Sequence, residues 1–151
     1  SPPDVQKQAL EEQIKLALQY DLPICFHVRE AFEDFWPIFD KYPGIRGVLH
    51  SFTDTQQNLQ KAIDRGLYIG VNGISTFTKD QQQTAIYRDL PLQKILLETD
   101  APYLTPVPFR GKMNLPAYVG SVAEHQAQLK DVPVADVIST TTGNAKVLYR
   151  I

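Results

Sequence analysis

The chain has 151 residues, of which 43% are hydrophobic and 21% are charged, and these proportions are those of a globular segment with one core. Its formal net charge of -2 and pI near 5.9 argue against a broad basic surface that coats nucleic acid, so any phosphate recognition is expected to be local. No apolar run approaches the roughly 20 residues that span a bilayer, and the start carries no signal-peptide pattern, so we expect neither a membrane-spanning nor a secretory protein.

The chain opens Ser-Pro-Pro-Asp and then continues in a helical pattern. Serine is a favoured N-cap and proline a favoured first helical residue, so we predict a helix with Ser1 as N-cap and Pro2 at its first position. Apolar residues recur at helical spacing from Val5 to Leu18 and predict an amphipathic helix that ends near Asp21. A chain that starts at a helix cap, without Met, indicates that it is cut from a longer protein.

Short apolar runs and helical patterns then alternate along the chain. The predicted strands are 23–28, 47–50, 67–72 and 94–98, and the predicted helices between and after them are 32–42, 55–65, 79–89, 116–130 and 134–148. This alternation predicts right-handed βαβ units and a parallel sheet. A complete (β/α)₈ TIM barrel has about 250 residues, so four units amount to roughly half of one. We predict a single α/β domain over residues 1–151; a small open α/β sheet is the alternative.

Four ionisable side chains stand at the ends of predicted strands, where functional groups of parallel α/β folds gather. His27 ends the first strand and His50 the second, whereas Glu98 and Asp100 end the fourth on one face, because side chains alternate along a strand. Imidazole and carboxylate together suit zinc, manganese or iron. We therefore predict a divalent metal site made by His27, His50 and Asp100. Glu98 is a further ligand, a hydrogen-bonded partner of a ligand, or an ion-pair partner.

Two other residues are of types that can bind metal, but we predict no metal-binding or catalytic role for them. Cys25 shares the strand face of His27, but a lone cysteine is predicted to be buried as a small apolar residue. The absence of a second cysteine excludes an intrachain disulfide and suits a reducing compartment, so we predict a cytoplasmic protein. His125 lies in the middle of a predicted helix, far from any strand end, so we predict that it is a surface or packing residue.

A long Pro-rich segment, 101–115, follows the fourth strand, and loops of this length are usually functional. It carries Arg110 and Lys112 just before a helix whose predicted N-cap is Asn114. Cations beside a helix N-terminus favour the binding of a phosphate group. An exposed basic loop without a ligand is the alternative. Arg29, two residues after His27, either reaches a substrate phosphate or pairs with a neighbouring glutamate.

Three segments resemble the TatD-type deoxyribonucleases, and the third is the most specific. They are LPICFHVREA at 22–31, GVLHSF at 47–52 and LLETDAPYL at 96–104. The loop around Arg110 to Asn114 and the closing helix also resemble the family, so the similarity runs nearly from end to end.

The resemblance implies a TIM-barrel hydrolase that cleaves phosphodiester bonds in DNA with one or two divalent ions, either zinc, manganese or magnesium. It carries over His27, His50 and Asp100 as metal ligands, and Asp100 is also expected to accept a proton from the attacking water. Arg29, Arg110, Lys112 and Asn114 are the expected phosphate contacts.

The family would also supply a His-x-His pair and a glutamate from strands that this sequence does not contain. We therefore predict weak metal binding and little activity for this chain alone. The alternatives are a hydrolase of another ester or amide, and a non-catalytic fragment that self-associates. Open strand edges and the inward apolar residues Val48, Ile69 and Leu96 predict that two copies pair as a homodimer.

Overall fold

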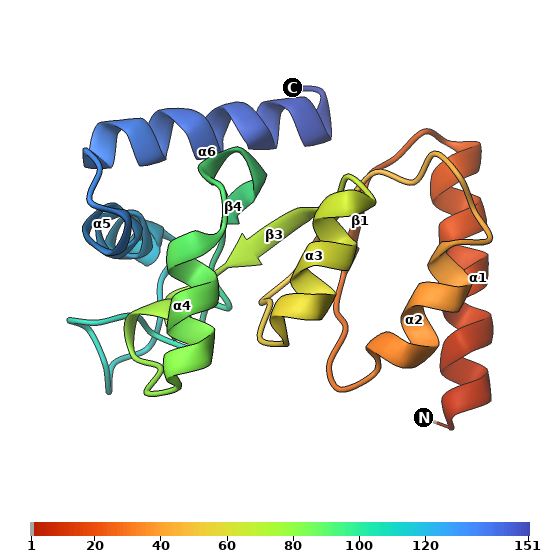
Figure 1. Ribbon diagram of the computed structural model, residues 1–151, viewed down its shortest axis with the longest axis horizontal. Coiled ribbons are helices and arrows are strands. Elements are labelled where there is room, and N and C mark those ends of the chain that lie inside the picture. The colour runs from red at the N-terminus through yellow and green to blue at the C-terminus, as the bar shows by residue number, and fades with distance from the viewer. Residues whose placement is uncertain (1) are drawn as a thin grey trace.

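The computed structural model describes residues 2–151 as a parallel sheet with helices packed around it (Figure 1). The strands are β1 (Ile24–Phe26), β2 (Gly47–Leu49), β3 (Tyr68–Val71) and β4 (Ile95–Leu97), paired in the order β1-β2-β3-β4. The α-helices are α1 (Pro3–Gln19), α2 (Phe32–Phe39), α3 (Gln56–Asp64), α4 (Gln81–Asp89), α5 (Val119–Lys130) and α6 (Val134–Tyr149). The 3₁₀ helices are η1 (Gly73–Thr76), η2 (Leu92–Lys94) and η3 (Pro116–Tyr118). The predicted parallel α/β fold is confirmed.

The helix starts follow from local chemistry. Helix α1 begins at Pro3 with Pro2 as its N-cap, one residue later than predicted, and Ser1 lies outside the described residues. The N-cap of α3 is Thr55, whose side chain accepts a hydrogen bond from the backbone N–H of Asn58, a preferred capping arrangement. None of the helices within residues 2–151 is long and apolar enough to cross a membrane.

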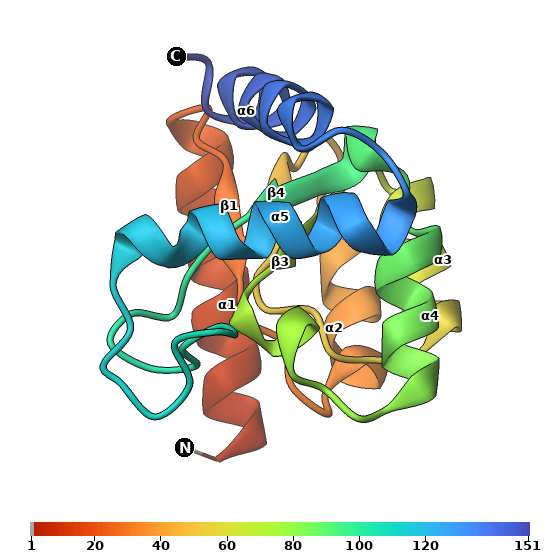
Figure 2. The ribbon, with the colours of Figure 1, turned by 90° about the vertical axis from the view of Figure 1, so that its left-hand side faces the viewer.

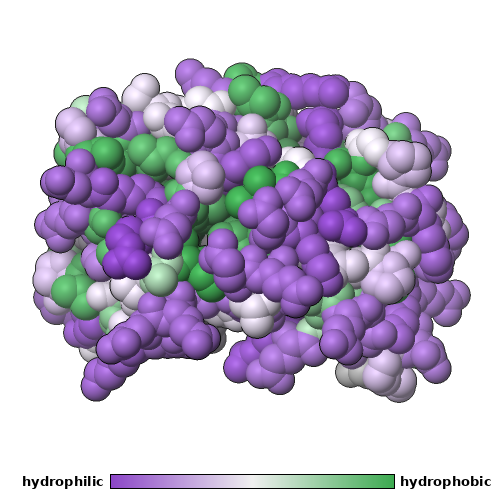
Figure 3. Space-filling view, viewed as in Figure 1, coloured by the Kyte–Doolittle hydropathy of each residue, from purple (hydrophilic) through white to green (hydrophobic). Residues whose placement is uncertain are grey.

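The two faces of the sheet are packed differently. Leu49, Ile69 and Ile95 are aligned by the strand register on one face, where they join the main core with residues of α1 to α4. On the opposite face Val48 and Leu96 pack against Leu148 of α6. Figure 3 shows that hydrophilic side chains cover most of the surface over α3 and α4.

This packing corrects one premise of the predicted homodimer. Ile69 does not share the inward face with Val48 and Leu96, because its register partners Leu49 and Ile95 belong to the opposite face. Val48 and Leu96 are only 2% and 6% exposed, since α6 already covers them. The inward apolar surface is therefore mostly buried within the chain. The pairing of two copies through the outer strands β1 and β4 stays a prediction.

Helix α6 lies across the ends at which the strands begin. The guanidinium of Arg46, just before β2, donates to the carbonyl of Leu148 at 2.7 Å. The Asn144 amide donates to the carbonyls of Leu92 and Ile95, at the start of β4, both at 2.8 Å. Figures 1 and 2 show α6 along one end of the molecule. The ends at which the strands finish are therefore left to the loops that carry the polar residues.

Candidate metal centre

The finishing ends of β2 and β4 bring together His50, Glu98 and Asp100. His50 directly follows β2, and its N–H donates to the carbonyl of Phe26 in β1 at 2.8 Å. The N–H of Glu98 donates to the carbonyl of Val71 at 3.0 Å, which continues the pairing of β3 with β4. One potential ligand atom from each of the three side chains lies within 4.8 Å of the other two.

The His50 ring lies between the two carboxylates. Its Nδ1 is 3.0 Å from Oε1 of Glu98, and its Nε2 is 3.5 Å from Oδ1 of Asp100. The hydrogen bond with Glu98 is the main reason why the pKa of His50 is raised, and burial opposes the rise. Because Glu98 accepts the Nδ1 proton, the lone pair of neutral His50 is placed on Nε2, on the side of Asp100.

This geometry fits two ligands of one divalent ion. Two ligand atoms that are each about 2.1 Å from a tetrahedral zinc ion lie about 3.4 Å apart, close to the 3.5 Å between His50 Nε2 and Asp100 Oδ1. Histidine ligands usually donate their other ring N–H to a carboxylate, a backbone carbonyl or a water, which fixes the ring. Of the three roles predicted for Glu98, the contacts favour that of a hydrogen-bonded partner of a ligand.

Gly70 provides the space that Glu98 occupies. Gly70 is the β3 register partner of Leu96, and a Cβ atom added to it would lie 2.6 Å from Cδ of Glu98. Any side chain at residue 70 would therefore collide with the carboxylate that orients His50.

We expect the Gly70→Ala variant to bind Mn²⁺ about tenfold more weakly, because Glu98 must move and the His50 ring loses its fixed orientation. Isothermal titration of the whole protein measures the change. Gly120→Ala is the matched control, since a Cβ at Gly120 meets no atom within 4 Å. Equal Mn²⁺ affinity in the two variants would show that Glu98 does not need this space.

Sequence reasoning missed two residues of this site, Ser51 and Asn72. The backbone N–H of Ser51 donates to Oε1 of Glu98, and its φ of 51° is in the left-handed region that non-glycine residues rarely adopt. Asn72 is 1% exposed, and its amide Nδ2 lies 2.8 Å from Oδ1 of Asp100. The available signal was the position of Asn72 directly after the third strand, equivalent to that of His50 after the second.

His27 lies beside this group but not within it. Its ring centroid is 5.7 Å from that of His50, and its side chain is exposed at the end of β1. It lines a hollow of about 730 Å³ between α1, β1 and α2, together with Cys25 and Arg29. The prediction that Cys25 is buried was wrong: the residue is exposed, because β1 is an outer strand and α6 packs instead on Val48 of β2 and Leu96 of β4.

The long loop is held in place by its own side chains. The Arg110 guanidinium lies 3.8 Å from the centroid of the Phe77 ring and donates to the carbonyl of Thr105 at 2.8 Å. Lys112 is exposed. Asn114 is only 2% exposed, and its amide Nδ2 donates to the carbonyl of Tyr103 at 2.6 Å.

The predicted cap at Asn114 was wrong. The N-cap of η3 is Leu115, and α5 begins only at Val119, because the Asn114 side chain is turned inward to the loop. Asn114 therefore shapes the segment after Asp100, and its buried amide is not open to a substrate phosphate.

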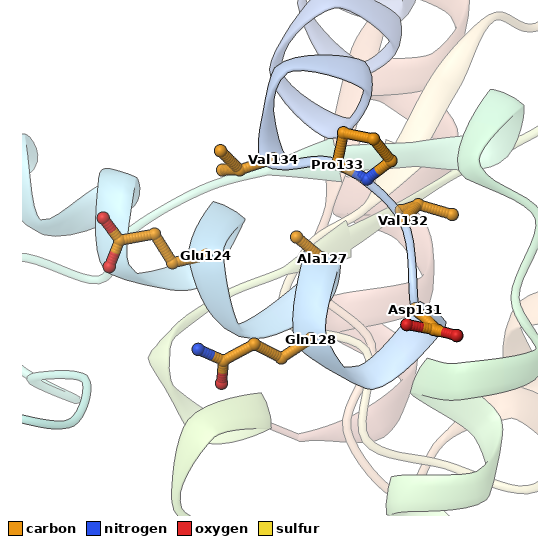
Figure 4. A pocket seen from close by; sticks show the side chains of 7 residues that line it. All are labelled: Glu124, Ala127, Gln128, Asp131, Val132, Pro133 and Val134. Atoms are coloured by element: carbon orange, nitrogen blue, oxygen red, sulfur yellow. The ribbon is translucent and has the colours of Figure 1, made fainter.

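His125 and a second hollow lie outside this metal group. His125 is half-buried in α5, where burial lowers its pKa and the Ser75 backbone provides a hydrogen bond, as expected for a packing residue. A second hollow, of about 530 Å³, lies where α5 meets α6 (Figure 4). Its two carboxylates, Glu124 and Asp131, stand on opposite sides of it, so they do not form a metal cluster (Figure 4).

The chain is similar to known proteins over nearly its whole length. The family model described as "TatD related DNase" matches residues 1–150. The "Uncharacterized metal-dependent hydrolase YabD" of Bacillus subtilis is 39% identical over 153 residues, which cover 100% of this chain and 60% of that protein. The "3'-5' ssDNA/RNA exonuclease TatD" of Citrobacter rodentium is 35% identical, over 100% of this chain and 60% of its own length.

A solved structure shows the same arrangement of elements. The crystal structure of YJJV, a TatD homologue from Escherichia coli, superimposes with a TM-score of 0.89 at 29% identity and covers 98% of this chain and 57% of that protein. The chain thus spans about 60% of the length of the curated relatives. Its four-stranded parallel sheet corresponds to part of a TIM barrel. The chain belongs to the TatD-related DNase family of metal-dependent hydrolases.

Proposed function

We propose that the protein containing this chain is a metal-dependent nuclease that hydrolyses phosphodiester bonds in DNA. The observation that carries the proposal is the 3.5 Å approach of His50 Nε2 to Asp100 Oδ1, with Glu98 on the opposite ring nitrogen of His50. The family description and the exonuclease relative support DNA as the substrate.

The three side chains have different tasks in this proposal. A divalent ion held there would lower the pKa of a bound water to about 7 and polarise a phosphoryl oxygen. His50 supplies Nε2 as a ligand, while Glu98 keeps its Nδ1 protonated and its ring fixed. Asp100 is a ligand and accepts the proton of the attacking water. His27, next to His50, is proposed as a further ligand.

Cationic side chains on the loops that follow β1 and β4 would receive the phosphate. We propose this role for Arg29, Arg110 and Lys112, because guanidinium and ammonium groups neutralise charge that develops in the transition state. Arg110 is already oriented by Phe77 and Thr105, so little side-chain freedom is lost when it binds. Contacts to the phosphate backbone alone would make cleavage independent of sequence.

Release of nucleotides from end-labelled DNA by the whole protein tests the proposal. We expect cleavage with added Mn²⁺, Mg²⁺ or Zn²⁺ and none with a chelator. Absence of cleavage with every ion would refute the nuclease assignment. If the protein instead cleaves an ester or amide from a substrate panel and leaves DNA intact, the proposed metal site stands and DNA is refuted as the substrate. The 151-residue chain alone is proposed to bind metal weakly, because it offers few ligands.

A further inference from the structure

Asn72 stands at the finishing end of β3, between the strands that carry His50 and Asp100. Its side chain is almost completely buried, with 1% of its surface exposed. Its amide Nδ2 donates to Oδ1 of Asp100 and to Oγ of Ser51, both at 2.8 Å. Its Oδ1 accepts the N–H of Ile74 at 3.0 Å. A buried amide with this set of partners has one defined orientation.

The contacts require an amide with its nitrogen toward Asp100. Both N–H groups of Nδ2 have an acceptor, and the carbonyl oxygen has a donor, so the main hydrogen-bonding capacity of the side chain is used. The reverse orientation would place the amide oxygen against the Asp100 carboxylate, where two acceptors repel each other. This orientation therefore allows Asn72 to hydrogen-bond both the Asp100 carboxylate and the backbone N–H of Ile74.

The same contacts connect the two halves of the metal centre. Ser51 accepts from Asn72 through Oγ and donates through its backbone N–H to Glu98, which holds the His50 ring. Asn72 thus fixes the Asp100 carboxylate directly and the Glu98 carboxylate through Ser51. The oxygen that Asn72 anchors, Oδ1, is also the one that lies 3.5 Å from Nε2 of His50, so the amide sets the position of the ligand atom itself and leaves the second oxygen of Asp100 to accept a proton.

We infer that Asn72 is a positioning residue that sets the Asp100 carboxylate against His50 for metal binding; this rests on the metal site of the proposed function. The competing explanation is that Asn72 only caps η1 through Ile74. The two roles use different atoms of the side chain, Nδ2 for Asp100 and Oδ1 for Ile74. They are therefore separable by substitution.

Asn72→Ser is the decisive variant, because serine is a good N-cap that can accept from Ile74 but is too short to reach Asp100. Ser75→Ala is the matched control, since it removes a 2.9 Å hydrogen bond to the Asn72 carbonyl in the same turn without touching Asp100. Both variants are made in the whole protein. Co²⁺ is the probe, with affinity and visible absorption spectrum as readouts, and urea unfolding of the metal-free protein reports the stability of each variant.

We expect Asn72→Ser to raise the Kd for Co²⁺ about tenfold and to change the absorption spectrum of bound Co²⁺. Ser75→Ala is expected to retain the Co²⁺ affinity and the absorption spectrum, even if its urea unfolding midpoint falls as much as that of Asn72→Ser. An unchanged affinity and spectrum in Asn72→Ser, or equal losses in the two variants, would overturn the inference. If the unsubstituted protein binds no Co²⁺, the proposed metal site fails as well, so the two failures are distinguishable.

Discussion

Replacement of Asp100 by asparagine is expected to lower metal-dependent DNA cleavage by the whole protein about a hundredfold or more. The substitution keeps the size of the side chain but removes its negative charge, its affinity for a divalent ion and its ability to take a proton from water. The amide oxygen of the substituted side chain can still accept the hydrogen bond from Asn72, but its NH₂ group then stands in place of the second carboxylate oxygen and can neither bind an ion nor accept a proton. Initial rates on end-labelled DNA with saturating Mn²⁺ measure the effect.

The control for this prediction is Asp131→Asn. Asp131 is an exposed carboxylate between α5 and α6, at the hollow in Figure 4, and it takes no part in the His50 group. Its substitution is expected to leave the rate within about twofold, as for surface changes away from a site. Equal rates in Asp100→Asn and the unsubstituted protein would remove Asp100 from both of its proposed roles.

Replacement of His50 by alanine is expected to weaken Mn²⁺ and Zn²⁺ binding by about a hundredfold or more. A lost ligand costs more than the 10–100-fold typical of a lost hydrogen-bonded partner, and the Glu98 and Asp100 carboxylates then lose the ring that lies between them. Isothermal titration of the whole protein gives both dissociation constants.

The chain offers a matched histidine for comparison. His125 is also half-buried, but it packs in α5 against the Ser75 backbone and lies outside the metal group. His125→Ala removes the same number of atoms and is expected to leave metal affinity unchanged. The assignment of His50 as a ligand would fall if the two variants bound Mn²⁺ equally well.

Much of the fold was predictable because burial leaves a clear pattern in a parallel sheet. The four apolar runs are the observed strands within one or two residues, and His50 and Asp100 meet because parallel strands finish at the same edge of a sheet. The side on which Ile69 lies was not predictable. β3 carries Ile69 and Val71 on one face and Tyr68 and Gly70 on the other, and the register against β2 and β4 decides which face is inward.

The roles of two asparagines were not predicted correctly, and the reason is the same for both. Asparagine is frequent in turns and caps, so residue type alone does not distinguish Asn72, which holds a carboxylate, from Asn114, which holds a loop, and only the position of Asn72 directly after a strand pointed to the site. The difference lies in the partners that tertiary structure brings to each amide, Asp100 for one and the Tyr103 carbonyl for the other. The exposure of Cys25 likewise depends on which strand lies at the edge of the sheet.

The contact between Gly70 and Glu98 makes two positions on neighbouring strands share one volume. The carboxylate of Glu98 keeps its place beside His50 only while position 70 has no side chain, and a larger residue at position 70 would leave that place to a shorter residue at position 98. Single substitutions at either position therefore meet a barrier that a paired exchange avoids. The two sites are expected to vary together among related proteins, and swapping both at once is the way to redesign the support beneath His50.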